Sequence, residues 1–150
     1  PTIYIGDYYD EAGTLREDER NAYYIEHERP TWIKWLTKAH KKGVKIGVGL
    51  DLGAQGYKPK VFAREFATLT EIGMTNMEAI QAGTRVNAEL LGWDDRLGTL
   101  QAGKLADIIA IEGNPLADIS KLESVSFVML GGKIIKSPGE AEPLPGMFIQ

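Results

Sequence analysis

Asp51 is the residue whose type and position point most directly to chemistry. It follows an apolar run at 44–50 that predicts a short strand buried on both faces, as in a parallel sheet. In parallel α/β folds, catalytic and ligand-binding groups gather beyond the carboxyl ends of the strands. Asp51 is therefore our candidate catalytic residue. Because Leu52 and Gly53 follow it, a turn-forming or Asx-capping role is the structural alternative.

Four other polar side chains are candidates for a site. His27 and His40 lie in a charged helical stretch, where a solvated surface or a helix-end charge explains them better than metal binding. Tyr57 and Lys58, in the loop beyond Asp51, could line a substrate pocket, although a loop-surface role is favoured. Substrate-binding residues therefore stay unassigned.

Three further patterns are expected to be structural. Trp32 and Trp35 are three apart on one helical face and predict a packing stripe. Arg64 and Glu65 fall on the next predicted helix, where we expect them to pair or to face solvent. The Gly47-x-Gly49 pair lies inside the predicted strand, so it predicts close approach of helices and no phosphate loop.

Composition narrows the possible functions. The chain has 150 residues, 43 % of them hydrophobic, and a net charge of −4, which allows a packed core and argues against a nucleic-acid partner. It has no cysteine, which excludes disulfides, zinc thiolates and cysteine nucleophiles. No apolar run suits a membrane span, and no signal peptide is visible. Because the chain begins with Pro1, we expect the true N-terminus to be missing; the location stays unknown, with the cytoplasm slightly favoured.

The pattern of apolar and turn-forming residues predicts alternating strands and helices, followed by a small β module. The expected elements are a strand at 2–5, a helical stretch at 15–42 with a break near Glu28 and a restart at Pro30, the strand at 44–50, a helix at 59–72, short helices at 77–82 and 84–91, and strands at 106–111, 125–130 and 133–136.

Local signals mark several ends of these elements. Gly43 is expected to cap the first helical stretch, and Gly92 to end the last short helix. Thr75 and Glu78 predict a capping box, and Gly131-Gly132 predicts a tight hairpin turn. The apolar residues of the two short helices are expected to lie in the core: Met77, Ile80, Val86, Leu90 and Leu91.

Four segments, in this order, resemble the amidohydrolase superfamily of metal-dependent hydrolases, most closely its imidazolonepropionase-like and prolidase-like branch. Residues 43–51 are similar to the last barrel strand of that family, and residues 73–92 to its closing helices. Residues 97–109 resemble its return to a composite β domain, and residues 128–135 its terminal hairpin.

The resemblance implies an α/β fold: the C-terminal part of a (βα)8 TIM-like barrel plus part of a small composite β-sandwich domain. Residues 1–96 would supply the last two βα units and closing helices, 97–136 the C-terminal strands of the β domain, and 137–150 a proline-containing tail. Two barrel strands cannot close a barrel of about 250 residues. The remainder is therefore expected from upstream sequence or from another chain.

The resemblance also implies a role for Asp51, as a metal ligand or as the group that accepts a proton from metal-bound water. Leu50 stands where the family usually has threonine, so a hydroxyl is missing at the edge of the site. The other family ligands would lie on earlier strands. Asp107 matches a family position in the β domain, where it is expected to hydrogen-bond the turn at 98–104.

Two functions follow as alternatives. The first is a hydrolase of C–N bonds in amides, peptides or cyclic amides, with a divalent metal, zinc by resemblance, and a small-molecule or dipeptide-like substrate. This chain alone is expected to be inactive, and a homo-oligomer is expected. The second is a non-catalytic module, standing alone or oligomerising, derived from the same fold.

Overall fold

The computed structural model describes residues 23–50 and 61–139. The expected strand at 2–5, the start of the first helical stretch and most of the tail lie outside the described residues. Within them, no helix is both long and apolar enough to cross a lipid bilayer.

The first helical stretch consists of η1 (Tyr24–Glu28), a π turn, and α3 (Arg29–Lys41). The chain does not leave the helix near Glu28 as expected, because the backbone N–H of Arg29 bonds to the carbonyl of Tyr24 through the π turn. The expected start of an α-helix with Pro30 in its first turn is confirmed. Pro30 lacks an N–H, and the wider turn before it lets the backbone continue without that bond. Gly43 follows with φ of +76°, which confirms the expected glycine cap.

Residues 44–50 form no strand, so the central strand expected there is wrong within the part of the chain that the structure describes. A strand forms only where a neighbouring strand accepts and donates its backbone hydrogen bonds. Here the Val48 N–H faces the carbonyl of Ala82 at 3.4 Å instead. The apolar pattern was nevertheless a correct sign of burial, because Ile46 and Val48 are both core residues.

Next come α4 (Val61–Glu71), α5 (Asn76–Gln81), the π turn η2 (Ala82–Val86) and α6 (Asn87–Leu91). The two short helices expected here are one continuous helix, because the chain stays in the right-handed helical region through Ala82 and Asn87. Gly92 ends it with φ of +68°, as expected.

The capping box at Thr75 is confirmed. The Glu78 N–H donates to Thr75 Oγ1 at 3.2 Å, and the Thr75 N–H donates to Glu78 Oε2 at 2.8 Å. The backbone N–H and the hydroxyl of Thr75 both donate to Glu78 Oε2 at 2.8 Å, and these two bonds favour the charged carboxylate and hold the pKa of Glu78 below its ordinary value of 4.5.

We expect Thr75→Ala to lower the free energy of unfolding by about 1 kcal/mol at neutral pH, the usual loss for an N-cap. Glu78→Ala should also be destabilising, but in a pH-dependent way. Because the pKa of the Glu78 carboxyl is lower in the folded chain than in the unfolded chain, the ionised carboxylate stabilises the fold fully at pH values above 4.5. This stabilisation is lost as the pH falls through the folded-state pKa of Glu78. Urea titrations at pH 7 and pH 3 measure both effects. A Glu78→Ala loss of equal size at both pH values would contradict this account.

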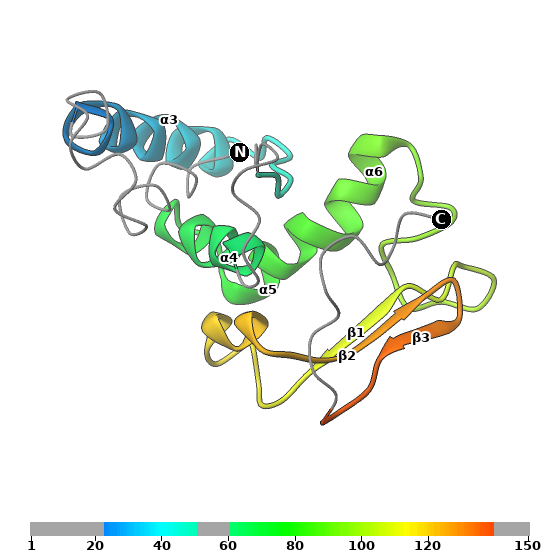
Figure 1. The fold of residues 1–150 in the computed structure, drawn as a ribbon. Coiled ribbons are helices and arrows are strands. Elements are labelled where there is room, and N and C mark those ends of the chain that lie inside the picture. The colour runs from blue at the N-terminus through cyan, green and yellow to red at the C-terminus, as the bar shows by residue number, and fades with distance from the viewer. Residues whose placement is uncertain (1–22, 51–60, 140–150) are drawn as a thin grey trace.

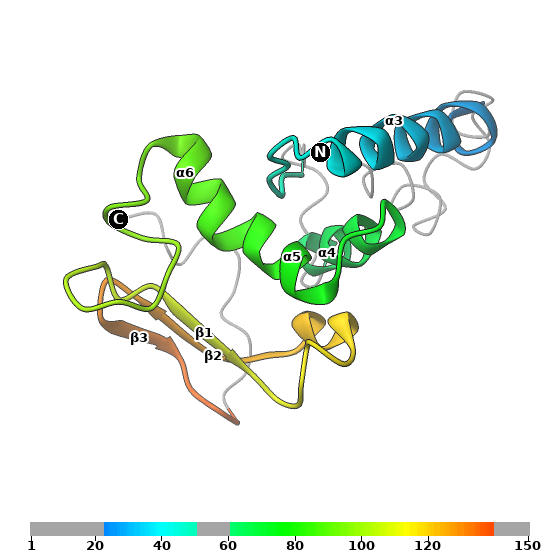
Figure 2. The same ribbon diagram turned by 180° about the vertical axis from the view of Figure 1, so that it is seen from behind.

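The β module is a three-stranded antiparallel sheet in the order β1 (Ile108–Ile111), β2 (Val125–Leu130), β3 (Lys133–Lys136). The short helix η3 (Ile119–Glu123) joins the first two strands. Gly131 and Gly132 form the turn with φ of +55° and +82°, as expected. Figures 1 and 2 show the sheet on one side of the continuous α5–α6 helix and α3 on the other.

The core lies among α3, residues 44–50, α4 and the α5–η2 helix. Its buried members are Ile46, Val48, Phe66, Leu69, Ile72, Met74, Ala79 and Ala82. The continuous helix packs through alanines, Ala79, Ala82 and Ala88, whose small side chains allow close contact.

The larger apolar residues of this helix were expected to be buried, and this was only partly right. Ile80 and Val86 are half-buried, but Met77, Leu90 and Leu91 are exposed. Trp32 and Trp35 are also exposed, at 56 % and 55 %, so they do not form the expected packing stripe. Helical spacing identifies a common face, but the element that covers that face is decided by tertiary structure.

The helix α4 carries a buried polar side. Glu65 is completely buried, so the expectation that it could face solvent is wrong. Arg64 pairs as expected: its Nε lies 3.5 Å from Glu123 Oε1, which links α4 to η3.

Candidate functional site

The candidate catalytic residue Asp51 lies outside the described residues, as do Tyr57 and Lys58. The structure does describe residues 44–50, which lead directly into Asp51. The contacts between residues 44–50 and the α5–α6 helix therefore form the described part of the candidate site.

Both backbone polar groups of Val48 meet the continuous α5–α6 helix. The Val48 N–H faces the Ala82 carbonyl at 3.4 Å, and Asn87 Nδ2 donates to the Val48 carbonyl at 2.8 Å. The second bond has the ordinary length for an N–H to oxygen contact, whereas the first is long. The side-chain amide of Asn87 is therefore the stronger of the two links.

Gly47 lies directly against the same helix. A Cβ built on it would lie 2.1 Å from Asn87 Oδ1 and 2.9 Å from Leu90 Cδ1. The expectation that this glycine allows a helix to approach is therefore confirmed. Gly49 differs, because a Cβ there would meet no atom within 4 Å.

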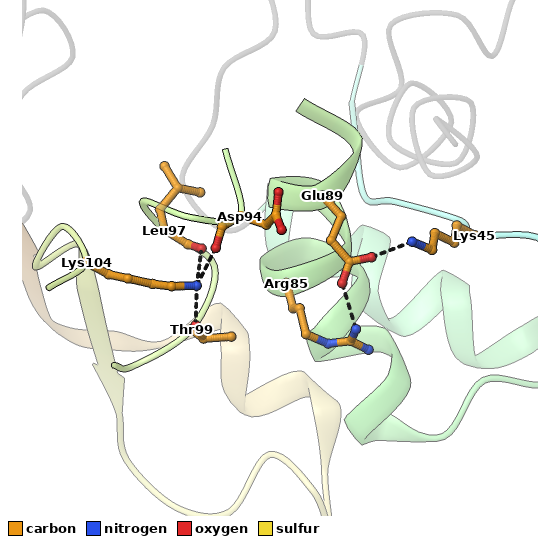
Figure 3. A network of polar contacts seen from close by, with 7 residues as sticks. All are labelled: Lys45, Arg85, Glu89, Asp94, Leu97, Thr99 and Lys104. Atoms are coloured by element: carbon orange, nitrogen blue, oxygen red, sulfur yellow. Dashed lines mark hydrogen bonds and ion pairs between the residues drawn. The ribbon is translucent and has the colours of Figure 1, made fainter. Parts of the chain in front are cut away.

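An ion-pair network lies beside these contacts (Figure 3). Lys45 Nζ is 2.7 Å from Glu89 Oε2, and Arg85 Nη1 is 2.8 Å from Glu89 Oε1. The hydrogen bond from Lys45 and the charges of both cations hold the pKa of Glu89 below its usual value. The carboxylate of Glu89 thus joins the segment before Asp51 to α6 a second time.

The two histidines are not gathered into a site. His27 is exposed, with Nε2 3.9 Å from Glu26 Oε2 and its ring 4.6 Å from that of Tyr23. His40 is half-buried in the last turn of α3. Among residues 23–50 and 61–139, no group of three or more histidine, cysteine, aspartate or glutamate side chains could hold a metal ion.

The expected partner of Asp107 is wrong. Asp107 Oδ1 accepts the N–H of Gly131 at 2.6 Å, so it supports the hairpin turn between β2 and β3. The turn at 98–104 is held by Lys104, whose Nζ donates to the carbonyls of Asp94 and Leu97 and to Thr99 Oγ1 (Figure 3). An ammonium group with three donors serves several carbonyl oxygens better than an acceptor-only carboxylate.

Sequence reasoning missed Asn87 and Glu89 as parts of this region. One signal was present, since Gly83 and Asn87 are four apart and therefore lie on one helical face. Nothing in the sequence, however, indicated that this face would meet Gly47 and Val48.

Residues 26–135 match the model of the amidohydrolase family. The chain belongs to this family.

Individual relatives support the assignment. Ochratoxinase from Aspergillus niger is 42 % identical over 112 residues, which cover 71 % of this chain and 22 % of the enzyme. Its crystal structure is similar with a TM-score of 0.72 and 29 % identity, covering 93 % of this chain and 32 % of that one. A crystal structure of a Xaa-Pro dipeptidase with bound methionine in the active site is similar with a TM-score of 0.77 and 37 % identity. The match covers 91 % of this chain and 34 % of that one. The chain thus spans about a third or less of these relatives.

Proposed function

We propose that this chain forms part of a hydrolase of C–N bonds, in amides, peptides or cyclic amides. The observation that carries the proposal is the family match over residues 26–135. The names of two relatives, an ochratoxinase and a Xaa-Pro dipeptidase, point the same way. The substrate class we propose is a small molecule or a dipeptide.

Asp51 is the residue of this chain that we propose takes part in the reaction, as a metal ligand or as a proton acceptor. An ionised carboxylate can serve either purpose. Two features support the choice: its place in the sequence after the buried Val48, and the contacts that hold residues 45–48 against the α5–α6 helix.

The described residues of this chain do not by themselves fit a divalent metal, because they include no cluster of ligands. We therefore propose that the other ligands, for zinc or a similar ion, belong to polypeptide beyond them. The same polypeptide, upstream or in a second chain, would supply the strands of a (βα)8 barrel that residues 23–50 and 61–139 do not contain, and the rest of the composite β domain. A homo-oligomer of the completed protein is part of this proposal.

The test is hydrolysis of Xaa-Pro dipeptides and of aromatic amides by the completed protein and by its Asp51→Asn variant. We expect kcat to fall by at least about a hundredfold, the usual scale for loss of a proton-transfer group. Asp107→Asn is a matched control. Asp107 binds the hairpin turn between β2 and β3, so its substitution should leave kcat unchanged. Full activity of Asp51→Asn would remove the assigned role.

A non-catalytic module is the second candidate. The absence of a ligand cluster among residues 23–50 and 61–139 favours it. Size-exclusion chromatography and thermal melting of the chain alone separate the two. A soluble monomer with cooperative melting would support an independent module, whereas dependence on added upstream polypeptide would support the hydrolase.

A further inference from the structure

Val48 is held at both of its backbone polar groups by one helix. In a regular extended segment the N–H and C=O of a residue point to the same side, as they do in a hydrogen-bonded strand pair. Here the groups on that side are the Ala82 carbonyl and the Asn87 amide. Residues of the η2–α6 helix therefore occupy the edge of Val48 that a neighbouring strand would otherwise pair with.

The contact is also sterically fixed. A Cβ on Gly47 would lie 2.1 Å from Asn87 Oδ1, so a side chain at position 47 is incompatible with this orientation of the Asn87 amide. Asn87 is half-buried, and the Val48 side chain is in the core. A substitution at Gly47 or Asn87 should therefore displace or remove this amide contact.

We infer that Asn87 is a positioning residue: its amide, donating to the Val48 carbonyl, fixes residues 46–50, the described end of the segment that precedes Asp51. The inference rests on the proposed function for its catalytic consequence only. The position of a reacting carboxylate matters because a displacement of about 1 Å can cost about a hundredfold in rate. Lys45 and Glu89 make a second link, but their ion pair is more exposed and contributes less.

The first test is amide hydrogen exchange on the full 150-residue chain. We expect Asn87→Ala to speed exchange at residues 46–50 by about three- to tenfold, the effect of losing one part-buried hydrogen bond. Gly47→Ala should do the same from the other side of the contact. Gly49→Ala is the control, since a Cβ at Gly49 would face open space. Unchanged exchange in both Asn87→Ala and Gly47→Ala would overturn the inference.

Asn87→Asp separates hydrogen bonding from packing, because the side chains have the same shape. Protonated, the carboxyl can donate to the Val48 carbonyl; ionised, it cannot. The facing carbonyl should raise the pKa of the introduced carboxyl, so the contact should be present at low pH and lost as the pH rises through that value. After correction for the pH dependence of intrinsic exchange, the rates of Asn87→Asp at residues 46–50 should match those of the native chain at low pH. At pH 8 they should match those of Asn87→Ala. Equal acceleration at both would contradict the assignment.

Kinetics on the completed enzyme give the second readout. We expect Asn87→Ala to lower kcat by about tenfold or more, with KM changed by less than about twofold. The activity of Asn87→Asp relative to the native enzyme should rise as the pH falls. A native enzyme without hydrolase activity would refute the proposed function, and the exchange experiment would still decide the role of Asn87.

Discussion

Leu69→Ala should be among the most destabilising single substitutions in the described part of the chain. Leu69 is completely buried on α4, within the cluster that includes Ile46, Phe66 and Ile72. Removing its branched end loses apolar burial and leaves a cavity, which together cost about 2 to 5 kcal/mol. Urea unfolding followed by circular dichroism measures the change.

Leu100→Ala is the matched control, because Leu100 is 80 % exposed in the segment between α6 and β1. Its effect should stay within about 0.5 kcal/mol. A Leu69→Ala loss as small as that of Leu100→Ala would mean that α4 does not pack as described.

Gly83→Ala should destabilise the chain although alanine is the better helix former. A Cβ at position 83 would lie 2.4 Å from Phe66 Cζ and 3.3 Å from Val48 Cγ2. The helical preference would favour alanine by about 1 kcal/mol in open space. Overpacking costs about 1 to 3 kcal/mol, and the nearest atom belongs to a buried ring that has little freedom to move. The net change is therefore expected to be a loss.

A double-mutant cycle tests the cause. Phe66→Leu removes the atoms that the new methyl would meet, so Gly83→Ala should cost less in that background than in the native chain. The coupling between the two positions should be about 0.5 to 3 kcal/mol, as for residues in direct contact. Simple additivity would show that Phe66 is not what excludes a side chain at position 83.

Features set by neighbouring residues were predictable from the sequence. Thr75 and Glu78 form their capping box, and Gly131-Gly132 makes its turn between strands with the expected bounds. Each of these depends on the conformations available to a few consecutive residues. The amidohydrolase family was also predictable, because four such segments occur in a fixed order.

Features set by distant residues were not predictable in the same way. The apolar run at 44–50 correctly indicated burial, but whether it pairs with a strand or lies against a helix depends on what is beside it. Asp107 could serve either of two nearby turns, and only the folded chain selects Gly131. Asn87 had no sequence signature, since its function depends on Val48, 39 positions away.

The two outer strands of the sheet offer different edges to any additional strand. Strand β3 begins and ends with lysine, at Lys133 and Lys136. Lysine on an edge strand discourages growth of a sheet at that edge. Strand β1 reads Ile-Ile-Ala-Ile and carries no charge. A strand added to this sheet is therefore favoured beside β1.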